Sequence, residues 1–345
     1  MPDGPLLKPR ALRPGDRLAI VAPASPFPGD AFEAGVAELR RLGFEPVFDA
    51  GVFDRSGYVA GAADARARAL AAAFDDQSVA GIIAARGGYG SAEVLPFLAV
   101  DAIRRRPKLL IGYSDITALL AFLTTRCGMV AVHGPCVAAG LNGGRAACDA
   151  STFLRTLTSA EPLGVLPAPA LEALAPGEAA GPLLGGNLTQ LAASMGTPYA
   201  FDPPAGCVLW IEDVGERPYR LDRLLTQLRF AGVLDRACAV VCGEFPGCDE
   251  PDGSATARDA VGRALRGFAG PVVWGLPSGH AAGAALTLPL GVRTRVVAGP
   301  APFVEILESA VAETTESRIP PLDNARGGPE LVEGPSPESR RDAGL

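Results

Sequence analysis

The sequence PKLLIGYSDITALLAF, residues 107–122, changes character at its centre. Residues 109–113 are apolar, as in a buried strand, whereas the residues from Asp115 onward are typical of a helix. A strand that leads directly into a helix is the repeating unit of a parallel α/β sheet. A single serine, Ser114, lies at the junction, where it is either a helix cap or a nucleophile.

The same alternation of short apolar segments and segments rich in alanine and leucine runs through residues 1–135. It predicts an α/β fold in which residues 1–140 form a Rossmann- or flavodoxin-like domain with a parallel sheet. Ligands of such sheets bind at the carboxyl ends of the strands, where Ser114, Gly87 and Gly88 would lie. The expected strands are 17–25, 45–50, 80–86, 108–113 and 129–134, and the expected helices are 30–42, 62–74, 91–98 and 115–125.

The rest of the chain divides by composition. Residues 141–180 are rich in alanine, proline and glycine with weak periodicity, which indicates a connection between domains. Residues 181–310 again alternate strand-like and helix-like segments, and we expect them to form a second α/β domain. Residues 311–345 are polar, rich in proline and glycine and free of aromatic residues, so we expect a disordered tail.

Composition limits the possible functions. A net charge of −7, with one short basic cluster at 104–108, argues against a nucleic-acid partner. The apolar segments are too short for a membrane helix and the N-terminus does not resemble a secretory signal, so we expect a cytoplasmic protein without a membrane partner. The seven cysteines are irregularly spaced and are expected to be reduced. Cys238, Cys242 and Cys248 lack a CxxC pair or a nearby histidine and do not predict a metal site.

The chain has only two histidines, His133 and His280. A serine nucleophile needs a base at neutral pH, most often a histidine that a carboxylate orients. His133 ends a predicted strand of the first domain, whereas His280 lies in the glycine-rich loop LPSGHAAGAALTLPLG of the second. Each is either structural or catalytic on this basis, and the glycine-flanked loop slightly favours His280.

Several carboxylates are candidates to orient that base. Glu212 and Asp213 directly follow the apolar segment CVLWI, and a strand end is where an active-site acid would be placed. A functional role is favoured for Glu212, while Asp213 or Glu216 would also suit the cap of the next helix. Glu244 has the same placement after another predicted strand and remains a candidate.

The loop AARGGYGSAEV, residues 84–94, offers backbone N–H groups after a strand, which suit a developing oxyanion. Gly88 and Gly90 come close to the GxGxxG pattern, but Glu93 stands in place of its third glycine, so no dinucleotide site is expected. The chain also lacks a GxxxxGK[ST] motif. We therefore predict no cofactor.

The segment GYSDI resembles a nucleophile elbow, although Ile116 stands where GxSxG has its second glycine. Asp115 would supply the first amide of the helix behind Ser114. These residues alone leave Ser114 balanced between a cap and a nucleophile.

Six blocks of sequence follow one another along the chain: ARGGYGS, PKLLIGYSDITALL, HGP, LLGGNLTQL, IEDVGERPYRLDRLLTQL and GHAAGAALTLPLG. Taken together and in this order, they resemble the LD-carboxypeptidase family of serine peptidases, whose best-known members are cytoplasmic muramoyl tetrapeptide carboxypeptidases. By this resemblance Ser114 is the nucleophile, Glu212 the orienting carboxylate and His280 the base, and His133 is structural. The resemblance also implies a smaller, β-rich second domain and a homodimer.

The implied reaction removes the terminal D-alanine from a murein tetrapeptide in cell-wall recycling, through an acyl-enzyme. The N–H of Asp115, with that of Gly87 or Gly88, would stabilise the oxyanion. Arg86 and Arg217 are candidates to bind the terminal carboxylate of this small peptide substrate. Two alternatives stay open: an immunity peptidase of the same family that cleaves a toxic peptidyl-nucleotide, and a non-catalytic module that binds a ligand between its domains. The block EDVGERPYRLDRLLTQL favours the recycling branch.

Overall fold

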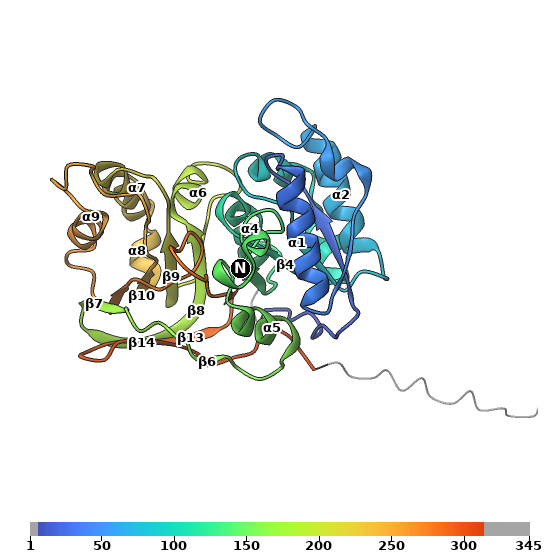
Figure 1. The fold of residues 1–345 in the computed structure, drawn as a ribbon. Helices are drawn as coiled ribbons and strands as arrows, with labels where there is room; N and C mark the ends of the chain where they lie inside the picture. The colour runs from blue at the N-terminus through green and yellow to red at the C-terminus, as the bar shows by residue number, and fades with distance from the viewer. Residues whose placement is uncertain (1–5, 314–345) are drawn as a thin grey trace, which may run out of the picture. The chain divides into compact units, whose positions relative to one another are not determined.

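Two β-sheets organise the chain (Figure 1). The computed structural model describes residues 6–313, which belong to one compact unit. From residue 314 onward, the tail that was predicted to be disordered lies outside this described part. The first sheet is built mainly from residues 17–133, and the second from strands that begin at residue 164. The predicted α/β fold, with a parallel N-terminal sheet and a β-rich second part, is confirmed.

The first sheet has six strands in the order β12-β5-β4-β3-β1-β2. Strands β1 to β5 run parallel, and β12 pairs antiparallel with β5. Every residue of β3, β4 and β5 is buried, as expected of a parallel sheet that is covered on both faces. The bounds are β1 (Arg17–Val21), β2 (Glu45–Val47), β3 (Gly81–Ala84), β4 (Leu109–Gly112), β5 (Ala131–His133) and β12 (Leu288–Leu290).

Helices fill most connections between these strands. In α1, Phe32, Val36 and Leu39 are buried at helical spacing, so one stripe faces the sheet. The helix predicted at 91–98 is a 3-10 helix that contains Pro96, whose missing N–H disfavours a regular α-helix. The α-helices are α1 (Gly29–Arg41), α2 (Ala63–Asp75), α3 (Val100–Arg105) and α4 (Thr117–Thr125), and the 3-10 helices are η1 (Ala50–Phe53), η2 (Ser91–Phe97), η3 (Ser114–Ile116) and η4 (Leu141–Ala146).

The second sheet has eight strands in the order β6-β14-β13-β8-β9-β10-β11-β7. Its central strands β8 to β11 run parallel, and antiparallel strands extend it on both sides. The six residues of β9 are all buried. The bounds are β6 (Gly164–Val165), β7 (Glu172–Ala175), β8 (Gly177–Asn187), β9 (Cys207–Glu212), β10 (Ala237–Cys242), β11 (Val272–Trp274), β13 (Arg293–Ala298) and β14 (Phe303–Ile306).

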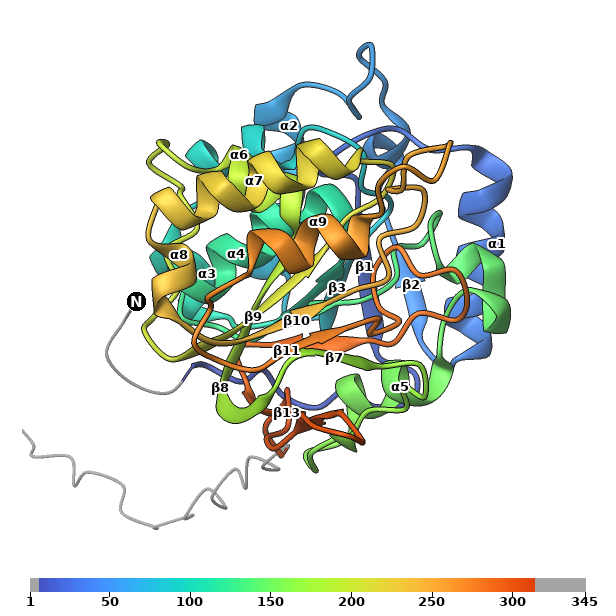
Figure 2. The same ribbon diagram turned by 90° about the vertical axis from the view of Figure 1, so that its left-hand side faces the viewer.

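Helices α7 and α9 lie side by side over one face of β9, β10 and β11 (Figure 2). Leu221, Leu225 and Leu228 of α7 are buried, and they share a cluster with Leu209 and Ile211 of β9. Among residues 6–313, no helix combines the length and the apolar character that crossing a membrane requires. The helices of this part are α5 (Ala150–Thr158), α6 (Leu188–Ala193), α7 (Pro218–Phe230), α8 (Val233–Arg236) and α9 (Ala257–Ala264).

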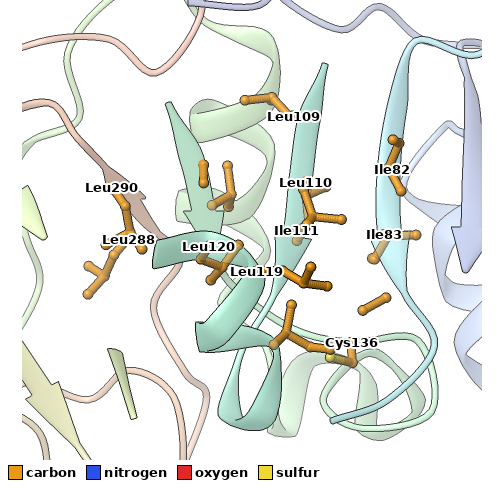
Figure 3. Close-up of a cluster of buried hydrophobic side chains, with 14 of the residues drawn as sticks. Ile82, Ile83, Leu109, Leu110, Ile111, Leu119, Leu120, Cys136, Leu288 and Leu290 are labelled. Carbon is orange, nitrogen blue, oxygen red and sulfur yellow. The ribbon is translucent and has the colours of Figure 1, made fainter. Parts of the chain in front are cut away.

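Strand β12 connects the two parts, because it follows β11 of the second sheet along the chain and yet pairs with β5 of the first. Leu288 and Leu290 are buried in the same cluster as Leu110 and Ile111 of β4 (Figure 3). Trp210 of β9 belongs to this cluster as well. One hydrophobic cluster therefore extends between the two sheets.

Residues 141–180, predicted as a connection between domains, carry η4, α5, β6, β7 and the first residues of β8. The short strands β6 and β7 are the two edges of the second sheet. A strand of two to four residues is stabilised by its neighbour, and sequence periodicity alone does not reveal it. The proposed domain bounds of 1–140 and 181–310 stay a prediction.

Candidate active site

Glu212 and His280 form a direct pair at the carboxyl end of the second sheet. Glu212 is the last residue of β9, and its side chain is 1% exposed. Its Oε2 lies 2.7 Å from Nδ1 of His280 and accepts the His280 backbone N–H at 3.0 Å. Since an ionised carboxylate can only accept, Nδ1 carries the proton in this pair. The second ring nitrogen, Nε2, is then left to act as a base.

The pair changes the pKa of both groups. Burial alone would lower the pKa of His280, but the hydrogen bond and the negative charge of Glu212 outweigh it and raise that pKa. Burial alone would raise the pKa of Glu212, and the hydrogen bond and charge of His280 lower it instead. Each partner therefore favours the charged form of the other.

Ser114 lies at the junction of β4 and η3 with a φ of +63°. Only one other non-glycine residue of the described chain, Phe245, has a positive φ. A left-handed backbone of this kind costs on the order of 1–3 kcal/mol and is found at functional sites such as nucleophile elbows. The residues at the cap positions of η3 and α4 are Tyr113 and Ile116, and neither makes a side-chain capping bond. The interpretation of Ser114 as a helix cap is therefore wrong.

Ser114 lies against the glycine loop on one side. A Cβ added to Gly87 would come within 2.9 Å of the Ser114 Cβ and 3.2 Å of its Oγ. On the other side, the ring of Tyr113 packs against the ring of His280 with centroids 4.9 Å apart. Tyr113 and His280 also line one cavity of about 280 Å³. The fold thus brings the glycine loop, the serine junction and the His280 loop into one region.

The two sheets are joined at this region by Asn187, a residue that the sequence analysis missed. Its backbone N–H donates to Oγ1 of Thr117, in the first turn of α4. Its side-chain Nδ2 donates to Glu212 at 3.3 Å and to Asp213 at 3.0 Å. In the block LLGGNLTQL, Asn187 stands between strand-like and helix-like residues, and this position is the feature of the sequence that could have marked it as functional.

Asp213 is buried and does not cap α7. Its carboxylate accepts from the N–H and hydroxyl of Thr189 and from the N–H of Val214. Burial raises its pKa, although these hydrogen bonds oppose the change. The cap position of α7 is Arg217, so neither Asp213 nor Glu216 holds it.

His133 lies behind the pair and is fully buried. Its ring is 6.3 Å from that of Tyr113 and 5.6 Å from that of Trp210, centroid to centroid. Neither ring nitrogen has a hydrogen-bond partner among the described residues. Burial lowers the pKa of His133 to about 4, so it is neutral near pH 7.

The two candidate arginines differ in position. Arg86 directly precedes Gly87, is exposed, and donates to the carbonyl of Pro26. Arg217 instead forms an ion pair with Glu250 at 3.2 Å. Arg86 is therefore the one beside the glycine loop.

The cysteines behave as isolated thiols in the described chain. Burial raises the pKa of Cys248 to about 11 and that of Cys136 to about 12. No group of three potential metal-binding side chains gathers within residues 6–313.

A strained serine at a strand end, near a buried carboxylate–histidine pair, is an arrangement typical of serine hydrolases. Residues 18–134 match the family model of the LD-carboxypeptidase N-terminal domain, and residues 180–296 match that of the LD-carboxypeptidase C-terminal domain. The chain therefore belongs to the LD-carboxypeptidase family, as the sequence blocks predicted.

Individual relatives agree with this assignment. The chain is 40% identical to SCO6489 of Streptomyces coelicolor over 291 residues, which cover 83% of this chain and 92% of that protein. It is 34% identical to the murein tetrapeptide carboxypeptidase of Pseudomonas aeruginosa over 273 residues, 77% of this chain and 88% of the relative. A solved structure of the microcin C7 self-immunity protein MccF superposes with a TM-score of 0.81 at 25% identity, covering 89% of this chain and all of that one.

Proposed function

We propose that this protein is a serine carboxypeptidase that removes the terminal D-alanine from murein tetrapeptides in cell-wall recycling. The observation that carries the proposal is the buried Glu212–His280 pair, whose histidine packs against the residue that precedes the strained Ser114. The similarity to the Pseudomonas aeruginosa enzyme supports the choice of substrate.

The first step would form an acyl-enzyme. Nε2 of His280 takes the proton of the Ser114 hydroxyl, and Oγ attacks the carbonyl carbon of the last peptide bond. The resulting imidazolium lies beside the Glu212 carboxylate, which stabilises its charge. The imidazolium then gives its proton to the departing nitrogen, and D-alanine leaves. A water molecule, deprotonated by the same nitrogen, hydrolyses the ester and releases the tripeptide.

The oxyanion would be stabilised by backbone N–H groups on the two sides of Ser114. Asp115 supplies the first amide after the nucleophile, and the glycine loop supplies the second. Gly87 and Gly88 are both candidates for this second amide, because they belong to the loop that lies against Ser114. Asp115 is held in place since its carboxylate accepts the N–H of Ser91 at 2.8 Å.

The terminal carboxylate of the substrate would be bound by a cationic side chain near Ser114. Arg86 suits this role better than Arg217, because it flanks the glycine loop and Arg217 is already paired with Glu250. A guanidinium can bind a carboxylate through two parallel hydrogen bonds, which would fix the hand of the D-residue.

The test is a direct assay of the purified protein with L-Ala-γ-D-Glu-meso-diaminopimelate-D-Ala, in which free D-alanine and the tripeptide are both measured. We expect turnover by the wild type and a loss of about three or more powers of ten in Ser114→Ala. Ser159→Ala, at the end of α5, is the matched control and should keep full activity. No D-alanine at micromolar enzyme would refute the proposal.

An immunity peptidase is the second candidate, favoured by the close superposition on MccF. Relative rates on the tetrapeptide and on a peptidyl-adenylate analogue separate the two substrates. A non-catalytic binding module would keep both its ligand and its cellular effect in Ser114→Ala, whereas a peptidase would lose turnover.

We also propose a cytoplasmic location and a homodimer, both of which follow from the resemblance to cytoplasmic, dimeric members of the family. Cell fractionation tests the location. Light scattering of the purified chain tests the dimer, and a monomeric mass at assay concentration would contradict it.

A further inference from the structure

The loop that carries His280 is held by carboxylates along its exposed part. At its base, the hydroxyl of Ser278 donates to the carbonyl of Leu286, and the N–H of Ala285 donates to the carbonyl of Ala147. Between these points, the hydrogen bonds within the described chain run to two side chains only, Glu212 and Glu244. Glycines flank His280 in this loop, so little else stiffens it.

Glu244 approaches the loop from β10, the neighbour of β9. It stands two residues after Cys242, the last residue of that strand, and its Oε2 accepts the N–H of Ala282 at 2.7 Å. The Glu244 carboxylate has no cationic partner among the described residues. The N–H of Ala282 is therefore the hydrogen-bond donor that it accepts from. Gly243, just before it, lies so close to Glu212 that an added Cβ would come within 2.9 Å of the Glu212 Cβ.

The residue after Glu244 is under backbone strain. Phe245 has a φ of +53°. With Ser114, it is one of the two non-glycine residues of the described chain that have a positive φ. Its ring is buried and stacks on the ring of Trp274, with centroids 5.0 Å apart and an angle of 11° between the ring planes. Because packing fixes the Phe245 ring while its backbone is strained, the surrounding structure holds the backbone in this turn. The turn sends the chain away from β10 directly after Glu244.

We propose that Glu244 is a positioning residue, which together with Glu212 holds the His280 loop in the geometry that the proton transfer needs. Glu212 fixes the imidazole and the His280 N–H, while Glu244 fixes the chain two residues further on. With one of the two anchors removed, the loop can rotate about the other. This inference rests on the proposed function, since it assigns His280 the role of base.

The test compares Glu244→Ala and Glu244→Gln with the wild type. Kinetics on the tetrapeptide should show kcat of Glu244→Ala lower by about 10- to 100-fold, because a displacement of about 1 Å can cost that much, while KM changes little. Glu244→Gln should recover part of the loss, since its carbonyl oxygen can still accept the Ala282 N–H. The control is Glu305→Gln on β14, a half-buried carboxylate of the same sheet away from the site.

A second measurement does not depend on activity. Hydrogen exchange of the peptide that spans residues 278–286 should be faster in Glu244→Ala than in the wild type or in Glu305→Gln, with a similar thermal unfolding midpoint in all three. Unchanged exchange in Glu244→Ala overturns the proposal, and so does faster exchange with unchanged kcat. If the wild type releases no D-alanine, the proposed function fails, and the exchange data still decide whether Glu244 anchors the loop.

Discussion

Glu212→Gln should remove most of the proposed activity while leaving the fold in place. The two carboxylate oxygens accept hydrogen bonds from three donors, which are the N–H and Nδ1–H of His280 and Nδ2 of Asn187. Glutamine keeps the size of glutamate but has one acceptor oxygen, so its amide group must face at least one donor. The variant therefore loses the negative charge and gains one mismatched contact.

The magnitude follows from the charge that develops on His280. When Ser114 gives up its proton, the imidazolium lies beside Glu212 with about 4 Å between charge centres, and the attraction is roughly 4 kcal/mol at an effective dielectric near 20. Since about 1.4 kcal/mol corresponds to a tenfold change in rate, kcat should fall by about a thousandfold. The mismatched donor costs on the order of 1–3 kcal/mol of stability. The protein should remain folded at room temperature.

The pH dependence of the activity gives a second, independent test of the Glu212–His280 pair. Glu212 raises the pKa of His280 above its ordinary 6.5, so kcat/KM of the wild type should rise with pH through a midpoint above that value, where the base becomes neutral. Without the carboxylate, burial is the main influence and lowers the pKa. In Glu212→Gln the midpoint of the residual activity should therefore move to lower pH.

The assay is D-alanine release between about pH 5 and pH 9, with thermal unfolding of each variant as the check on folding. Glu305→Gln serves again as the carboxylate control and should match the wild type in both rate and midpoint. A Glu212→Gln protein that keeps more than about a tenth of kcat/KM, with an unshifted midpoint, would refute the assignment of Glu212 and His280.

Three further variants test other contacts of the site. Gly87→Ala sets a Cβ 2.9 Å from that of Ser114, so D-alanine release should fall at least about tenfold with little change in thermal midpoint. Asn187→Ala removes one donor from Glu212 and should lower kcat by about tenfold, which steady-state kinetics would show. His133 has a folded pKa of about 4 against 6.5, so the unfolded chain binds the extra proton and wild-type stability should drop by roughly 3 kcal/mol as pH falls through this window. In urea unfolding at about pH 7 and pH 4.5, His133→Leu should lack that part of the drop.

The first sheet could be predicted from the sequence because its strands are short apolar runs that end at glycine or at a turn. β3 and β4 are buried along their whole length, and their composition reflects this directly. Strand β12 could not be predicted in the same way. Its sequence, LPL, becomes a strand only because β5 lies beside it, and no local pattern contains that information.

The candidate site was predicted in part from the sequence. Glu212 was favoured as a strand-end acid, whereas His280 was only slightly preferred over His133 until the family resemblance chose it, and the structure places Glu212 and His280 2.7 Å apart. The positive φ of Ser114 was not predictable, since a serine in a left-handed conformation is held there by its surroundings. Asn187 was missed because an asparagine between a strand and a helix is typical of a helix N-cap. Asn187 also has this role, since its side chain accepts the N–H of Gln190 at the start of α6.

The placement of His280 relative to Ser114 is built into the topology. The loop of His280 leaves β11 in the second sheet and returns to β12, which pairs with β5 in the first. Strand β5 in turn pairs with β4, the strand that ends just before the Ser114 junction. Thr117 and Asn187 join the two sheets a second time, close to Glu212. The proposed base and the proposed nucleophile are thus both connected to strands of the first sheet, while Glu212 and Glu244 of the second sheet hold the loop that carries His280.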